Sequence, residues 1–317
     1  MNPKISILLV AWKEEKTAPR AMETILEGYE KDDYEILWAI ADTPTKNAVL
    51  EKAEKMGISK HVRISDLVQD EKPKGKPKEL NYIMDMAKGE IWIFGDGDVE
   101  YKPGAINLLL KHFGNPNVMA VTGRPRSADS KETMMGYFGH LLADAAHHKR
   151  MIDLTDNPEG RSTKFIKKRP FFPVSGYLFA MRASDIRAPE DTLVEDAFFS
   201  YEIHNRGGKI EYEPEAEVYV KYPQNLKDYF KQKKRSAGGY VQLWKYGVVK
   251  PETKTRSFWR ELEYFWFPLK YAKGPKQFLW SLMLYPIRLW QWIIIHWEQK
   301  IKKKSFFETW TRVESTK

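Results

Sequence analysis

Short, continuous apolar runs that alternate with helical segments are the feature that most constrains how this chain can fold. Residues 4–10 form such a run, and residues 34–41 and 90–94 form two more. A run without polar alternation is typical of a strand that is buried on both faces of a sheet. Because segments with a helical pattern lie between the runs, the sequence predicts an α/β fold with a mainly parallel central sheet flanked by helices.

Acidic residues follow two of these predicted strands. Asp42 comes after the second run, and Asp96-Gly97-Asp98 comes after the third. In sheets of this kind, ligands bind beyond the C-terminal ends of the strands. Two carboxylates one residue apart can share a divalent cation, because Mg²⁺ and Mn²⁺ prefer oxygen ligands, and such a cation neutralises a departing diphosphate. The same pair is also compatible with a solvated turn or a helix cap.

A loop rich in lysine and glycine precedes the next predicted helix. In Gly75-Lys-Pro-Lys-Glu-Leu-Asn81, backbone N–H groups and either Lys76 or Lys78 can be placed near a phosphate. A lysine-rich surface loop has the same composition. The loop by itself therefore leaves both interpretations open.

Two acidic pairs stand at predicted helix starts. Glu195-Asp196 opens a predicted helix, where a carboxylate is either a cap or a general base, a role worth about 10²–10⁴ in rate. Glu14-Glu15, after the first predicted strand, can read a nucleoside together with Asp42 or can be ordinary helix-start carboxylates. A further basic pattern, Gln232-Lys-Lys-Arg235, is by itself typical of a solvated helix face.

Taken together and in this order, the motifs resemble a family 2 glycosyltransferase of the GT-A fold. The resemblance is strongest to the cytosolic domain of processive synthases such as hyaluronan, chitin, poly-N-acetylglucosamine and cellulose synthases. The resemblance covers residues 3–245 and is carried by Glu14/Glu15, Asp42, Lys74-Gly-Lys-x-x-x-Leu-Asn81, Asp96-x-Asp98, Val174-Ser175-Gly176, Glu195-Asp196 and Gln232-x-x-Arg235. An ordered set of this kind is far more specific than any single member.

The resemblance implies a nucleotide-sugar donor, usually a UDP-sugar. Glu14 or Glu15 and Asp42 would hold the nucleoside, and Lys76 would lie near the diphosphate. Asp96 would sit beside the ribose or the metal, and Asp98 would ligate Mg²⁺ or Mn²⁺.

On the acceptor side, the resemblance implies an inverting reaction. Asp196, next to Glu195, would be the base that deprotonates a hydroxyl of a glycan or lipid-linked acceptor. Gln232 and Arg235 would close over the acceptor and the diphosphate. Ser175 and Gly176 would form the acceptor-side wall.

Two departures from the family pattern bear on the acceptor and the nucleoside. The last block usually reads Gln-x-x-Arg-Trp, whereas Ser236 follows Arg235 here, and Asp42 is the one carboxylate kept from the usual Asp-Asp-Gly-Ser. Three other functions stay open: a polyprenyl-phosphate glycosyltransferase, whose acceptor oxygen is already ionised, a sugar nucleotidyltransferase, and a non-catalytic basic protein that binds nucleic acid or membrane. The chain has no cysteine, which excludes disulfides and thiolate chemistry.

The net positive charge of the chain comes from its C-terminal part. Of the 317 residues, residues 221–317 hold 21 basic and 7 acidic side chains, whereas residues 1–220 hold 31 and 36. Eight of the 11 Trp also lie in this last part, a pairing that a lipid surface explains better than nucleic acid does. We therefore expect a GT-A catalytic domain over residues 1–225 and a basic, helical, membrane-associating extension over residues 226–317.

The segment at residues 278–297 is long enough to span a membrane but contains Arg288, Gln291 and His296. Ser281, Arg288 and Gln291 fall on one helical stripe, and lysines 300, 302, 303 and 304 follow. Trp-rich apolar faces with flanking lysines are typical of a helix that lies in the interface of an anionic membrane. We expect a peripheral protein at the cytoplasmic face of the cell membrane rather than a single span. A buried helix or an oligomer contact is the third interpretation of this segment.

Overall fold

A computed structural model describes residues 3–65, 75–154, 171–253, 255, 258–300 and 314–316. The chain divides into two compact units. Unit 1 contains Met1–Pro125, Pro173–Asp191 and Glu195–Val220, and unit 2 contains Arg126–Phe172, Thr192–Val194 and Lys221–Lys317. The predicted division into a catalytic domain over residues 1–225 and an extension over residues 226–317 stays a prediction. Unit 2 also contains residues from the middle of the chain.

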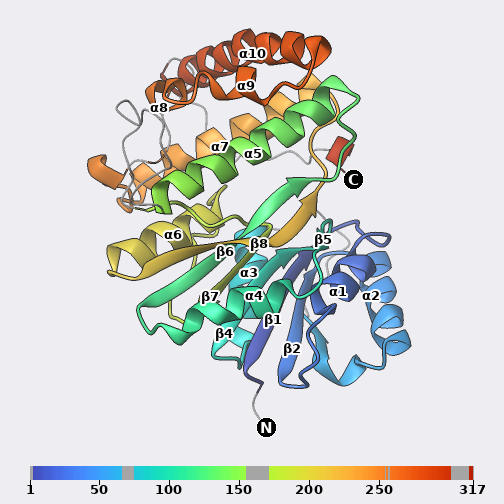
Figure 1. Cartoon of the computed structure of the whole chain (residues 1–317). Helices are drawn as coiled ribbons and strands as arrows, with labels where there is room; N and C mark the ends of the chain where they lie inside the picture. Colours follow the sequence, from blue (N-terminus) through green and yellow to red (C-terminus); the bar gives the residue numbers. More distant parts are fainter. Residues whose placement is uncertain are drawn as a thin grey trace. The chain divides into compact units, whose positions relative to one another are not determined.

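One half of the sheet is parallel, as the sequence predicts. Its four strands lie in the order β3-β2-β1-β4, and each adjacent pair is parallel (Figure 1). These strands are β1 (Ile5–Ala11), β2 (Tyr34–Ile40), β3 (Val62–Ile64) and β4 (Ile91–Asp96). The side chains of β1 and β2 are almost entirely buried, which explains their lack of polar alternation.

The other half of the sheet adds antiparallel pairs, so the whole sheet is mixed. It continues as β7-β6-β8-β5, and the pairs β4–β7, β6–β7 and β5–β8 are antiparallel. These strands are β5 (Glu100–Tyr101), β6 (Val118–Ser127), β7 (Leu178–Arg182) and β8 (Lys209–Val220). The α/β fold class is confirmed, and these antiparallel pairs are the structure's addition to it.

Pro214 predicts a break within residues 209–220, but these residues form the single strand β8. The two-residue strand β5 pairs only with Val218 and Tyr219. Pro214 therefore lies beyond the paired stretch on that side, where its missing N–H removes no bond to β5.

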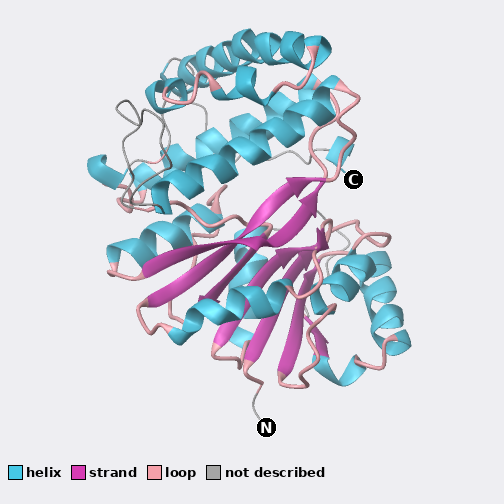
Figure 2. Ribbon diagram, viewed as in Figure 1, coloured by secondary structure: helices cyan, strands magenta, loops and turns pink. Residues whose placement is uncertain are grey.

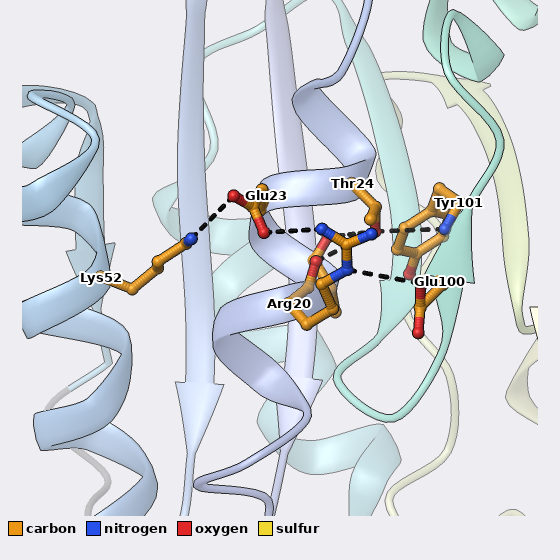
Figure 3. A network of polar contacts seen from close by, with 7 residues as sticks. Arg20, Glu23, Thr24, Lys52, Glu100 and Tyr101 are labelled. Atoms are coloured by element: carbon orange, nitrogen blue, oxygen red, sulfur yellow. Dashed lines mark hydrogen bonds and ion pairs between the residues drawn. The ribbon is translucent and has the colours of Figure 1, made fainter.

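Helices flank the sheet of unit 1 (Figure 2). They are α1 (Ala18–Leu26), α2 (Thr43–Lys55), α3 (Lys76–Met86), α4 (Ala105–Leu110) and α6 (Glu195–Asn205). A polar network ties α1 to β5 (Figure 3). Arg20 contacts Glu100 at 3.3 Å, and the backbone N–H of Tyr101 donates to Thr24 Oγ1 at 3.2 Å. These contacts hold the short strand that follows the Asp96-Gly97-Asp98 motif.

Unit 2 is built mainly from helices. They are α5 (Met134–Leu154), α7 (Leu226–Lys245), α8 (Phe258–Leu262), α9 (Phe267–Tyr271) and α10 (Pro275–Lys300). A buried cluster joins three of them, with Tyr137 and Phe138 from α5, Tyr229 from α7 and Leu284 from α10. Residues 134–142 of α5 therefore share a core with the C-terminal helices.

The predicted polar stripe of α10 faces this core. Ser281 is within 2.7 Å of the Tyr137 hydroxyl, and Tyr229 Oη donates to Gln291 Oε1 at 3.4 Å. Arg288 pairs with Glu261 of α8. Although Leu284 is buried in the cluster, several large apolar side chains of α10 are exposed, among them Leu279, Leu289 and Trp290.

Candidate active site

Lys76 brings together three motifs that are far apart in the sequence. Its Nζ lies 2.7 Å from Asp96 Oδ1 and 2.8 Å from Glu195 Oε1. Burial alone would lower the pKa of Lys76, but the two carboxylates outweigh it and hold that pKa well above its usual value. The lysine is therefore a fixed cation between the C-terminal end of β4 and the start of α6.

Local structure explains how Lys76 reaches this position. Gly75 has a φ of 115°, which other residues rarely adopt, and α3 begins at the next residue. Asn81, on the second turn, donates to the Ala188 carbonyl at 2.7 Å and accepts from the Ala188 N–H at 3.1 Å. This reciprocal pair fixes α3. Lys74, the first residue of the predicted motif, lies outside the described residues.

The Asp96-Gly97-Asp98 motif follows β4 as predicted. Gly97 stands between the two aspartates in the sequence. A Cβ at Gly97 would lie 2.8 Å from Glu14 Oε2, so the Glu14 carboxylate lies against this glycine. Tyr101 Oη donates to the Asp96 carbonyl at 3.0 Å. Burial and the charges of Asp96 and Asp98 raise the pKa of Tyr101 well above its usual value, so it stays a donor.

Asp42 shapes the loop after β1. Its Oδ1 accepts the Thr45 N–H at 3.0 Å as the N-cap of α2, and its Oδ2 accepts the Lys13 N–H at 2.5 Å. Lys13 has a φ of 54°, an uncommon value for a residue other than glycine. Asp42 thus holds a strained turn immediately before Glu14. Glu15, the other predicted nucleoside-binding residue, is exposed.

Asp196 stands in the first turn of α6, next to Glu195. Its Oδ1 accepts the Ala197 N–H at 2.8 Å, and its Oδ2 accepts the Gly176 N–H at 3.0 Å. Burial and the neighbouring Glu195 charge raise the pKa of Asp196, while Lys76 and the two N–H groups oppose that rise. A carboxylate with a raised pKa is a stronger base than a free aspartate.

Gly176 contacts Asp196 directly, and Ser175 is the buried residue before it. A Cβ at Gly176 would lie 3.3 Å from Asp196 Oδ2, so a larger residue would press on this carboxylate. Gln232 and Arg235 lie on α7 in unit 2, both half-buried. The described contacts therefore bring together Glu14, Lys76, Asp96, Glu195, Asp196 and Gly176 within unit 1.

The donor set fits a divalent cation that shares its coordination with a ligand. Across the described ranges, no group of three or more His, Asp or Glu residues could hold a metal by itself. Asp96 and Asp98 supply two carboxylates, and Mg²⁺ is commonly held by one or two carboxylates with substrate phosphates and water. The residues therefore suit a cation that arrives with a phosphorylated substrate.

Sequence reasoning did not find the residues that support the site. Tyr101, Thr122 and Ser200 are buried. Tyr101 donates to the Asp96 carbonyl, and Thr122 and Ser200 accept backbone N–H groups of the Val174-Ser175-Gly176 motif. An isolated Ser, Thr or Tyr belongs to no motif of fixed spacing, so the sequence does not mark it. Only the tertiary structure identifies such residues.

Comparison with known proteins places the chain in a family. Residues 3–239 match the family described as glycosyltransferase like family 2. The poly-β-1,6-N-acetyl-D-glucosamine synthase of Staphylococcus aureus is 26% identical over 242 residues, which are 74% of this chain and 54% of the synthase. The chain thus spans about half the length of the curated relatives it matches.

Solved structures agree on the fold. A mannosyltransferase from Pyrobaculum calidifontis aligns with a TM-score of 0.65 and 16% identity, over 96% of this chain and 89% of its own. Residues 1–349 of TarS from S. aureus align with a TM-score of 0.51 and 15% identity, over 92% and 78%. The fold is therefore a GT-A-like glycosyltransferase fold. The chain belongs to glycosyltransferase family 2 and is a glycosyltransferase.

Proposed function

We propose that the protein is an inverting, metal-dependent glycosyltransferase that moves a hexose-type sugar from a UDP-sugar to a hydroxyl of a glycan or lipid-linked acceptor. One observation carries the proposal. Lys76 pairs with both Asp96 and Glu195, so the lysine loop, the Asp-x-Asp motif and the Glu-Asp helix start meet at one point. A nucleoside diphosphate needs a positive charge beside it, and its cation needs carboxylate ligands. Lys76 supplies the charge, and the Asp-x-Asp motif supplies the carboxylates.

On the donor side, Asp98 and Asp96 would ligate Mn²⁺ or Mg²⁺ together with the diphosphate, and Lys76 would face the same phosphates. The cation supplies charge neutralisation as the diphosphate departs. Glu14, packed against Gly97, and Asp42, which shapes the preceding turn, would hold the nucleoside. Gln232 and Arg235 would close over the bound substrates from α7.

On the acceptor side, Asp196 would remove the proton from the attacking hydroxyl. The new bond forms at the anomeric carbon as the bond to the diphosphate breaks, which inverts that carbon. The raised pKa of Asp196 supports this role, and the Gly176 N–H orients the carboxylate. Glu195 is engaged with Lys76, so we assign it to holding the lysine.

Two relatives support the donor class. The P. calidifontis mannosyltransferase was solved with GDP-mannose and Mn²⁺, and the S. aureus relative is named for a polymer of N-acetylglucosamine. The first supports a nucleotide-sugar donor with a divalent cation, and the second supports the transfer of a sugar into a polymer. A screen of nucleotide sugars with Mn²⁺ or Mg²⁺, which detects nucleoside diphosphate release, tests the proposal directly.

Asp98→Asn should reduce nucleoside diphosphate release by at least about 100-fold, because a charge that stabilises the departing group is lost. Asp32→Asn is the matched control, since Asp32 is exposed and, among the described residues, pairs with Lys60 and His61. Equal activity of Asp98→Asn and the wild type would overturn the metal assignment. Release of pyrophosphate instead of a nucleoside diphosphate would indicate a nucleotidyltransferase.

Asp196→Asn separates two acceptor classes. With a hydroxyl acceptor, turnover should fall by about 10²–10⁴, because the base is lost. With a polyprenyl-phosphate acceptor, whose oxygen is already ionised, turnover should change little. The second result would overturn the proposed base.

We also propose that the C-terminal helices place the enzyme on the cytoplasmic membrane face. In the part of the chain that the structure describes, α10 is the one helix long and apolar enough to span, by length and composition. Its polar stripe is already engaged with α5, α7 and α8, which favours an interfacial position over a span. Large apolar side chains of this region are exposed, namely Trp259, Leu262, Phe265, Trp266, Phe278, Leu279, Leu282, Met283, Leu289, Trp290, Ile293 and Trp297.

Flotation of the full chain with vesicles tests the membrane proposal. The pair Leu289→Ser and Trp290→Ser should weaken binding to anionic vesicles, because both side chains are about half exposed, at 50% and 56%. Leu50→Ser is the matched control, since Leu50 is an exposed leucine on α2 in unit 1. Unchanged binding by the double variant would contradict the proposal.

A further inference from the structure

Three consecutive backbone N–H groups before β7 each donate to a side-chain oxygen. Val174 N–H donates to Ser200 Oγ at 2.9 Å, and Ser175 N–H donates to Thr122 Oγ1 at 2.9 Å. The third, Gly176 N–H, donates to Asp196 Oδ2 at 3.0 Å. The backbone that holds the Asp196 carboxylate is thus itself held by two hydroxyl groups.

Both hydroxyls are fully buried, and each makes a second hydrogen bond. Ser200 Oγ donates to the Asp196 carbonyl at 2.6 Å, one turn back along α6. Ser200 therefore connects the backbone of Asp196 to the segment that contacts its side chain. Thr122, on β6, donates to the Gly123 carbonyl at 3.3 Å and so ties the same segment to the sheet.

We propose that Thr122 and Ser200 are positioning residues that fix the orientation of the Asp196 carboxylate through residues 174–176. This inference rests on the proposed role of Asp196 as the base. A base must meet the acceptor hydroxyl at hydrogen-bond distance, and a displacement of about 1 Å can reduce the rate about 100-fold. The two hydroxyls bind no substrate in this assignment; they act only through the backbone.

The decisive variant is Thr122→Val, which keeps the shape of the side chain and removes the hydroxyl. We expect turnover to fall by about 10- to 100-fold, while the KM for the nucleotide sugar changes less than about twofold. The donor KM should hold because Lys76, Asp96 and Glu14 are positioned by other contacts. Thr122→Ser retains an acceptor for the Ser175 N–H and should restore most of the turnover.

The pH dependence of turnover gives a second readout. The Gly176 N–H lowers the pKa of Asp196, so a displaced Gly176 should move the acid limb of the pH profile to higher pH. The other groups that act on Asp196 are Glu195, which raises its pKa, and Lys76 and the Ala197 N–H, which lower it, and all three remain in the variant. A purely structural role would lower the amount of folded enzyme without moving this limb.

Ser200→Ala is the second variant, in case Thr122→Val folds poorly. It should show the same fall in turnover and the same shift of the acid limb. UDP binding with Mn²⁺ serves as the folding control for both variants, because it uses the donor side only. Normal turnover in both variants, or an equal loss of UDP affinity and turnover, would overturn the inference.

The Asp196→Asn background separates this inference from the proposed function. If Asp196 is the base, Thr122→Val should reduce the residual turnover of Asp196→Asn by less than about twofold, because the two changes act through one group. If Asp196→Asn alone has normal turnover, the proposed base and this inference both fail. If Asp196→Asn is inactive but Thr122→Val is fully active, only this inference fails.

Discussion

At the scale of single residues, the candidate site is defined by which side chains form ion pairs and hydrogen bonds with one another, and residue type alone does not define it. Asp42 illustrates the difference. The sequence predicts that it holds a nucleoside, and its role there remains a prediction, but both of its oxygens accept backbone N–H groups and shape the turn at Lys13. Lys76 is the clearer case, because two motif carboxylates contact the same ammonium group.

Lys76→Met should reduce both the affinity for UDP with metal and turnover, the latter by about 100-fold, because the fixed positive charge beside the diphosphate is lost. Lys78→Met is the matched control, two residues along the same helix. Lys78 pairs at 3.4 Å with Glu190, an exposed carboxylate. Titration of UDP followed by steady-state kinetics compares the two variants. Equal losses in both would mean that the loop acts through its overall charge and not through Lys76.

At the scale of elements, hydrophobic periodicity predicts most helices and strands, and the tertiary structure changes their partners. The pairs β4–β7, β6–β7 and β5–β8 are antiparallel, and the two-residue strand β5 is too short to leave a pattern in the sequence. Helix α10 shows the same limit. Its polar stripe can be located from the sequence, but only the fold shows that α5, α7 and α8 cover it.

The pair of Arg288 and Glu261 should stabilise unit 2. Burial works to raise the pKa of Glu261, but Arg288 outweighs it, so this pKa lies below its usual value. A lowered pKa in the folded state means that the pair stabilises the fold above about pH 4.5 and that this stability is lost as the pH falls through the folded pKa.

Glu261→Gln should therefore destabilise the protein by about 3 kcal/mol at pH 7, because Arg288 is left without its counter-charge, and the difference should shrink in acid. Thermal unfolding followed by Trp fluorescence suits the test, since eight of the 11 Trp lie in residues 221–317. Glu51→Gln is the control, because its pair with Lys55 is exposed and contributes little to stability. A difference that does not change with pH would show that the ion pair is not its source.

At the scale of the whole molecule, the net positive charge and most of the large exposed apolar side chains lie in the C-terminal part of the chain. Residues 221–317 carry most of the Trp and the excess of basic side chains, and α8 and α10 expose a large set of apolar side chains. Lysines 302–304 belong to this charge excess but lie outside the described residues. Both features favour an anionic lipid surface as the partner.

Binding to anionic vesicles should therefore have two parts. The electrostatic part should weaken between low salt and about 0.5 M salt, because the Debye length falls below 10 Å, and the apolar part should persist. Flotation at both salt concentrations measures the two parts in the full chain. The variant with Leu289→Ser and Trp290→Ser should lose the salt-resistant part. Complete release of the wild type by salt would contradict an apolar contribution.

The sequence by itself determined the α/β class, the parallel half of the sheet and the family, because these depend on local hydrophobic patterns and on short motifs in a fixed order. It also located Lys76, Asp96, Glu195 and Asp196 as candidates. Only the tertiary structure decided which of them meet, that the sheet continues beyond β4 with antiparallel pairs, and that Thr122 and Ser200 hold residues 174–176. These features depend on contacts between residues far apart in the chain, which leave no periodic signal in the sequence.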